Sequence, residues 1–193
     1  MFKNFVVILM LTIPFLTGCV AAVATTALVG SDMASDRRTS GIYIEDQAIE
    51  LKANAAIEAN TSLKESSTIS VTSFNRIVLL VGQAPNQQLS DTASDIVRQI
   101  ENVRKVHNEI RIAAPGSFFS GTNDSWLTTK AKSLMLAEKD FLSGHIKVIT
   151  ENGEIFLMGM VTRAEADKAV AIVRDIDGVE RVVQVFEYIN ATP

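Results

Sequence analysis

The sequence predicts an α+β fold of two similar domains, each a small mixed sheet packed on two helices, preceded by a flexible tether. Two observations predict it. The region from Glu45 onward resembles the region from Asn123 onward, and both regions pass through helix, strand, strand, helix and strand patterns in the same order. An internal repeat of this length indicates a duplicated domain.

The repeat is visible as three pairs of matching segments. The offset between partners drifts only from 78 to 76 residues along the chain. The pairs are 46–53 with 124–131, 77–82 with 154–159, and 96–103 with 172–179. An apolar run closes with Gly82 in the first repeat and with Gly159 in the second.

The first helix of the second repeat is predicted from Asp124, a suitable N-cap, and from apolar residues at helical spacing. Leu127, Ala131 and Leu134 recur at i, i+4 and i+7 on one face. The equivalent helix of the first repeat opens with Asp46 in the same position relative to an apolar residue. Each repeat therefore begins with an amphipathic helix.

Two strands and a second helix follow. Residues 146–150 alternate between apolar and polar, Asn152-Gly153 is typical of a type I′ hairpin turn, and 155–160 form the next strand. The second helix spans 163–176 and ends at Gly178, which suits a left-handed cap before the strand 179–189. In the first repeat Asn102 takes the position of Gly178, and Asn also tolerates that conformation.

These patterns divide the chain into five segments. They are a signal peptide (1–18), a lipidated cysteine with a flexible tether (19–44), a first domain (45–113), a linker (114–122) and a second domain (123–191). One hydrophobic core is marginal in a domain this small. The strands 77–81 and 155–160 are also almost entirely apolar, whereas a sheet with one wet face should alternate. We therefore expect the sister domain to cover the second face of each sheet.

The N-terminus predicts export and lipidation. A positive charge at Lys3 precedes an apolar stretch (5–16) that contains Pro14 and is shorter than the roughly 20 residues a membrane span needs. The tetrad Leu-Thr-Gly-Cys ending at Cys19 resembles the lipobox of bacterial lipoproteins, in which the cysteine receives acyl chains such as palmitate. A buried core thiol is the alternative for a lone cysteine. Nothing foldable precedes Cys19, so lipidation is favoured.

Charge and residue usage argue against several functions. Removing Lys3 with the signal peptide leaves 17 basic against 22 acidic side chains, a net charge of −5, so nucleic acid is not an expected partner. The one cysteine excludes a disulfide framework and a thiolate metal site. His107, in the third strand of the first repeat, and His145, beside the first strand of the second, are expected to be structural or surface residues. No catalytic motif is found, so we expect no enzyme, no metal and no cofactor.

The lipidated cysteine, the small-residue tether and the two repeats together resemble the dual BON-domain outer-membrane lipoproteins. The match is carried by the strings 18–22, 81–86, 108–111, 123–130 and 150–159. The resemblance implies a lipid-anchored protein on the inner leaflet of the outer membrane that faces the periplasm and is enriched at the division site. It also implies that the second domain binds anionic phospholipid and that the protein supports envelope integrity.

The candidate lipid-binding residues lie on the first helix of the second repeat. This helix carries three lysines, whereas its counterpart in the first repeat has only Lys52 among several acids. Anionic headgroups favour Lys or Arg beside an amphipathic aromatic. The candidate set is Trp126, Leu127, Thr129, Lys130, Lys132 and Ser133. Phosphatidylglycerol is the expected type of ligand. From the residues alone a core position for Trp126 is favoured, and the family resemblance reverses this in favour of membrane contact.

A second function remains open. The wide sheet face or the acidic first domain could bind proteins of the outer-membrane assembly or division-hydrolase machinery, which would make the chain a non-enzymatic adaptor. The two functions are compatible. Dependence on lipid composition would separate them.

Overall fold

A computed structural model describes residues 36–113, 121–139 and 141–190. The signal peptide, Cys19, residues 20–35 of the tether and residues 114–120 of the linker lie outside these residues. Within them, no helix is both long enough and apolar enough to cross a bilayer.

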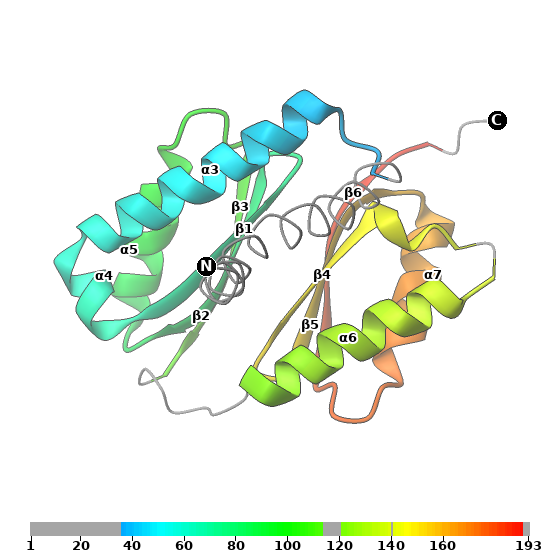
Figure 1. Cartoon of the computed structure of the whole chain (residues 1–193). Coiled ribbons are helices and arrows are strands. Elements are labelled where there is room, and N and C mark those ends of the chain that lie inside the picture. The colour runs from blue at the N-terminus through cyan, green and yellow to red at the C-terminus, as the bar shows by residue number, and fades with distance from the viewer. Residues whose placement is uncertain (1–35, 114–120, 140, 191–193) are drawn as a thin grey trace, which may run out of the picture. The chain divides into compact units, whose positions relative to one another are not determined.

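The first domain consists of three helices and a three-stranded mixed sheet. Its elements are α3 (Ser40–Ala59), α4 (Thr61–Ser66), β1 (Thr68–Phe74), β2 (Ile77–Ala84), α5 (Gln87–Arg98) and β3 (Lys105–Ile112). The strand β2 lies in the middle, antiparallel to β1 and parallel to β3. The helices α3 and α5 cover one side of this sheet (Figure 1).

The second domain repeats this plan. Its elements are α6 (Gly121–Ala137), the short 3-10 helix η2 (Ser143–His145), β4 (Ile146–Glu151), β5 (Glu154–Val161), α7 (Arg163–Arg174) and β6 (Arg181–Tyr188). The central β5 is antiparallel to β4 and parallel to β6. The predicted pair of mixed sheets, each packed on helices, is confirmed.

The left-handed backbone positions confirm the predicted turns. Asn152 and Gly153 have φ of 50° and 77°, as a type I′ turn requires, and Asn75 and Arg76 repeat this at 50° and 62°. Gly178 and its counterpart Asn102 also have positive φ, 91° and 69°. The duplicated turn and cap residues therefore hold equivalent backbone conformations.

The two aspartates that open the repeats have a different role from the predicted one. The helix α6 begins at Gly121, so Asp124 lies inside its first turn and is not the N-cap. Its carboxylate instead accepts hydrogen bonds from the backbone amides of Asn152 (2.8 Å) and Gly153 (2.9 Å) in the hairpin turn. A buried carboxylate satisfies two amides that point inward, which was not evident from spacing alone.

The first domain uses the same device. Asp46 is buried within α3 and accepts from the amides of Asn75 (2.8 Å) and Arg76 (2.7 Å). The duplicated aspartate thus fastens the first helix of each domain to its hairpin.

Two further boundaries differ from the sequence-based ones. Residues 40–44, assigned to the tether, are the first turn of α3, because the Thr39 side chain caps the helix by accepting from the Ile42 amide. The strands β2 and β5 also continue two residues past the glycines that seemed to close them. A Cβ at Gly82 would lie 2.0 Å from the Thr68 carbonyl oxygen, and one at Gly159 2.5 Å from that of His145. These glycines permit close strand approach rather than end the strand.

The second face of each sheet is covered by the sister domain, as expected. One buried cluster contains Phe74, Leu79 and Val81 of the first domain together with Phe156, Met158 and Val185 of the second. Leu79 and Phe156 are equivalent in the repeat, as are Val81 and Met158. The described residues therefore form three apolar cores: one under the helices of each domain and one between the two sheets.

We predict that Asp124→Asn lowers the free energy of unfolding by about 1–3 kcal/mol, because the amide replaces one carboxylate oxygen and leaves a buried backbone N–H without an acceptor. Asp95→Asn, at an exposed i,i+3 pair with Arg98, is the matched control and should change it by less than about 0.5 kcal/mol. Chemical denaturation measures both. Equal effects of the two substitutions would show that Asp124 does not fasten the hairpin.

Candidate functional site

One face of the helix α6 packs on the core of the second domain, and the other face is exposed to solvent. Leu127, Ala131 and Met135 are buried in the core beneath it. The opposite face carries Trp126, which is 50% exposed, and Leu136, which is 77% exposed. The ten positions between them correspond to about 15 Å along the helix axis. Two large apolar side chains are thus held in water on one helix.

Five of the six predicted lipid-binding residues lie on this outer side. Trp126, Thr129, Lys130, Lys132 and Ser133 are all exposed. Leu127 is fully buried and cannot contact lipid, so its place in the predicted set is wrong. Its helical position points it between the two helices and the sheet, where it joins the apolar core. Trp126, one step along, falls at the boundary and escapes burial.

Leu136 was missed by the sequence reasoning. Its neighbours Leu134 and Met135 fit the apolar periodicity of the buried face, so the pattern predicts a core position for the whole stretch. At 100° per residue, however, Leu136 falls on the side of Thr129 and Ser133 rather than of Met135. Extending the outer stripe from Trp126 by whole turns would have found it.

The lysines of α6 are available to an external anion. Among the described residues, neither Lys130 nor Lys132 forms an ion pair. Lys147 and Lys168, by contrast, are paired with Glu50 and Glu138, both at 3.0 Å. The outer face therefore combines exposed apolar side chains with uncompensated positive charge.

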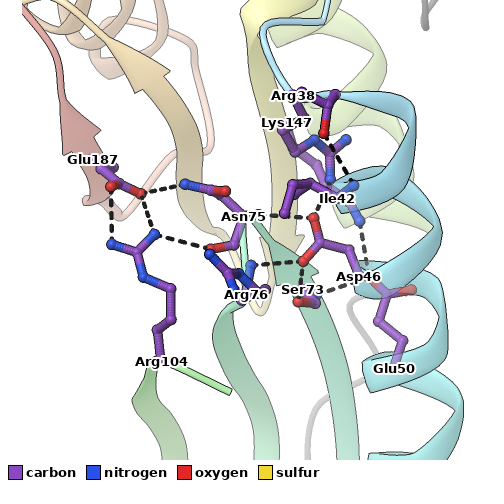
Figure 2. Close-up of polar contacts among 11 residues, drawn as sticks. Arg38, Ile42, Asp46, Glu50, Ser73, Asn75, Arg76, Arg104, Lys147 and Glu187 are labelled. Carbon is purple, nitrogen blue, oxygen red and sulfur yellow. Dashed lines mark hydrogen bonds and ion pairs between the residues drawn. The ribbon is translucent and has the colours of Figure 1, made fainter. Parts of the chain in front are cut away.

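A second set of polar residues joins the two domains (Figure 2). At one place Arg104 forms a two-pronged ion pair with Glu187, at 3.1 Å for both contacts, and Asn75 donates to the same carboxylate at 2.6 Å. Burial alone would raise the pKa of Glu187, but the hydrogen bonds from Arg104 and Asn75 outweigh it and lower the pKa.

At another place Glu154, nearly buried, lies between Arg111 and Arg181, with both contacts at 2.7 Å. Burial would again raise its pKa, and the two guanidinium groups lower it instead. Arg181 also pairs with Glu109 across the domain boundary at 3.0 Å. Ion pairs between the two domains thus hold them together at this place as well.

Two of these ion pairs are related by the repeat: residues that occupy equivalent positions in the two domains carry opposite charges. Arg104 is equivalent to Glu180, and Arg111 to Glu187. Arg104 contacts Glu187, and Arg111 contacts Glu180 at 3.4 Å. The first domain thus supplies the cation and the second the anion at both related places. Two first domains packed in the same way would bring Arg104 toward Arg111, which like-charge repulsion disfavours.

The histidines lie where they were expected. His107 is in β3, and its pKa is lowered by burial and by Lys105. His145 ends η2 and is buried, with its Nδ1 3.9 Å from the Glu165 carboxylate. Within the described ranges, no three His, Cys, Asp or Glu side chains gather as a metal site would require.

Comparison with known proteins supports the same architecture. The model of the BON domain family matches residues 45–114 and 123–190. The chain is 40% identical to the outer membrane lipoprotein DolP of Haemophilus influenzae over 97% of both proteins. It is 36% identical to the 21 kDa hemolysin of Actinobacillus pleuropneumoniae over 80% of both. It is also 30% identical to the osmotically-inducible protein Y of Escherichia coli K12, over 83% of this chain and 81% of that one.

We predict that charge reversal at one domain contact is rescued by the reciprocal change. Arg104→Glu and Glu187→Arg should each destabilise the protein, by about 1 kcal/mol because the pair is partly exposed, and the double variant should recover most of the loss. The same cycle at the Arg98–Asp95 pair, within α5, is the control. Additive losses at residues 104 and 187 would contradict a direct contact between them.

We also predict loss of stability in acid. The hydrogen bond from Arg37 lowers the pKa of Glu165 to about 2. A lowered folded-state pKa stabilises the fold above the unfolded value of about 4.3, and this contribution is lost as the pH falls toward 2. Glu165→Gln, which keeps a side chain suited to the helix cap, should lower the free energy of unfolding at pH 7 and flatten its decline between pH 4.5 and 2.

Denaturant titrations at pH 7, 4 and 3 measure this slope. Glu58→Gln, at an exposed position of α3, is the control and should leave it unchanged. If Glu165→Gln and Glu58→Gln give the same pH dependence as the unmodified protein, the Arg37–Glu165 contact does not stabilise the fold.

Proposed function

The chain belongs to the family of BON-domain proteins, and on that premise we propose that it is a lipid-anchored outer-membrane protein whose second domain binds anionic phospholipid through the outer face of α6. Full-length similarity to an outer membrane lipoprotein supports the envelope location. Acylation of Cys19 would supply the anchor, and the domains would face the periplasm. None of the three relatives is named as an enzyme, in keeping with a binding role.

The observation that carries the lipid-binding proposal is the exposure of Trp126 and Leu136 on one helix face. An indole ring at headgroup depth with a leucine one and a half nanometres along the helix suits a helix lying in the bilayer interface. Lys130 and Lys132 flank these residues and can reach phosphate oxygens. The outer face of α6 thus has the amphipathic character of an interfacial helix.

The attraction supplied by α6 alone is weak. Each lysine near an anionic surface contributes about 1 kcal/mol, and salt screens it. The acyl chains of Cys19 would hold the protein on the membrane, and the α6 contact then becomes an intramolecular event at high effective concentration. A weak headgroup contact can therefore select where on the membrane the protein resides, including the division site, and so support envelope integrity.

A protein-binding role has a separate observation in its favour. The sheet faces are occupied by each other and are not available to a partner. On α3, however, Ile44 and Leu51 are 67% and 73% exposed and lie two turns apart. This apolar stripe on the first domain could bind an envelope protein while α6 contacts lipid.

We predict that the soluble chain from Val20 onward binds vesicles containing phosphatidylglycerol and that Trp126→Ala or Lys130→Glu weakens this binding by at least about tenfold. Both residues are exposed, so the folded state should be unaffected. Leu51→Ala and Lys52→Glu on α3 are the matched controls, since they remove an exposed apolar and a basic side chain from the first domain.

Vesicle co-sedimentation with and without the anionic lipid measures the effect, and circular dichroism confirms folding. Equal sedimentation of the α6 variants and the unmodified chain would rule out this site. Sedimentation that ignores lipid composition would favour the adaptor instead.

A further inference from the structure

Two consecutive arginines at the start of the described chain contact different domains. Arg37 reaches the second domain, where its guanidinium donates to both Glu165 carboxylate oxygens and to the Met160 carbonyl, all at 2.8 Å. Two-pronged, charge-assisted contacts of this kind fix the position of both groups. The residue that the tether leads into is therefore held on the second domain.

Arg38 reaches the first domain instead. It pairs with the buried Asp46 at 2.8 Å (Figure 2). Its guanidinium also lies 3.9 Å from the ring centre of Phe74 and 5.1 Å from that of Tyr43. The point where the chain from Cys19 joins the folded domains is thus fixed to both of them.

Three contacts link this point to α6: the Arg37–Glu165 ion pair just described and two contacts of Lys168. Glu165 lies in the first turn of α7. One turn further on, Lys168 pairs with Glu138 at 3.0 Å and donates to the Lys139 carbonyl at 2.9 Å, just after the last residue of α6. Arg37 is therefore close to the C-terminal end of the helix that carries Leu136 and Trp126.

The far end of the first domain is much more distant. From its start beside Arg37, the 20-residue α3 extends about 30 Å before α4 begins. A tether leaving from that end would have to pass the whole first domain to reach the bilayer under α6.

We propose that Arg37 docks the base of the lipidated tether on the second domain, so that the acyl anchor and the outer face of α6 engage the same patch of bilayer. The order of the chain alone places the first domain next to the anchor. The docking adds the second domain, because it brings the anchored end to the domain with the exposed Trp126 as well. The inference rests on the proposed lipid contact of α6 and specifies how the anchor presents it.

The consequence is a high effective concentration of α6 at the membrane. Trp126 lies eleven positions from the last residue of α6, about 17 Å along the helix. The 17 residues between Cys19 and Arg37 can span up to about 60 Å when fully extended. The anchor can therefore remain inserted while the whole length of α6 lies on the surface.

The test replaces the tether by a lipid attached directly to the folded domains. The chain from Val20 onward has no cysteine, so a single one is introduced as Ser40→Cys, three residues from Arg37, or as Lys64→Cys on α4. Both sites are exposed. Each protein is coupled to a maleimide phospholipid in vesicles of phosphatidylcholine with a small fraction of phosphatidylglycerol. Quenching by brominated acyl chains reports the depth of Trp126, the single tryptophan.

We expect at least threefold stronger quenching of Trp126 for the lipid at residue 40 than for the lipid at residue 64. Equal quenching at both sites, or stronger quenching at residue 64, would overturn the docking proposal. Unlipidated protein in excess anionic vesicles separates this from failure of the proposed function. If Trp126 is not quenched there either, α6 does not bind lipid and both proposals fall.

A second measurement addresses Arg37 itself. Arg37→Ala should speed hydrogen exchange of the Ile42 and Tyr43 amides by about tenfold or more, because the Thr39 acceptors at the start of α3 are no longer held in place. Arg163→Ala is the matched control: it removes a neighbouring arginine of α7 that stacks on Tyr188 at 3.6 Å. Unchanged exchange in Arg37→Ala would show that the tether base is not docked.

Discussion

The structure depends on the burial of two apolar sheet faces against each other. Each three-stranded sheet is apolar on both sides, and helices cover only one of them. A domain of this size cannot leave Leu79 or Phe156 in water, because the exposed patch would cost both stability and solubility. Pairing the faces solves the problem for both domains at once. The remaining features follow from this arrangement.

One consequence concerns the helices. Since the sister domain occupies the inner face of the second sheet, α6 lies on the opposite face, and among the described residues nothing covers the outer side of Trp126 and Leu136. Trp126 and Leu136 are exposed for this reason. A single domain could present such a helix too, but its second sheet face would then compete for the membrane. Burying that face removes it from competition and leaves Trp126 and Leu136 exposed on the outer face of α6.

Another consequence concerns charge. Two identical copies of a domain would present identical apolar sheet faces. Such a face could pair with any other copy, including one on a neighbouring molecule. The exchanged pattern, with Arg104 and Arg111 on one repeat and Glu187 and Glu180 on the other, favours unlike domains over like ones. It also places Arg104 and Arg111, which lie near the domain boundary, in ion pairs with acidic side chains. The lysines of α6 lie outside this network, so they stay available to an external anion.

The sequence by itself determined the duplicated α+β plan, the hairpin and cap residues, and the covered sheet faces, because these depend on local periodicity and on positive-φ residues such as Asn152 and Gly178. It also placed in the candidate lipid-binding set five residues of α6 that are exposed in the structure. The tertiary structure decided what spacing cannot encode. Asp124 contacts a hairpin turn 28 residues away, and Arg37 contacts Glu165 across 128 positions. Contacts between residues so far apart depend on how helices, turns and sheets pack together in three dimensions, and no local pattern records that packing.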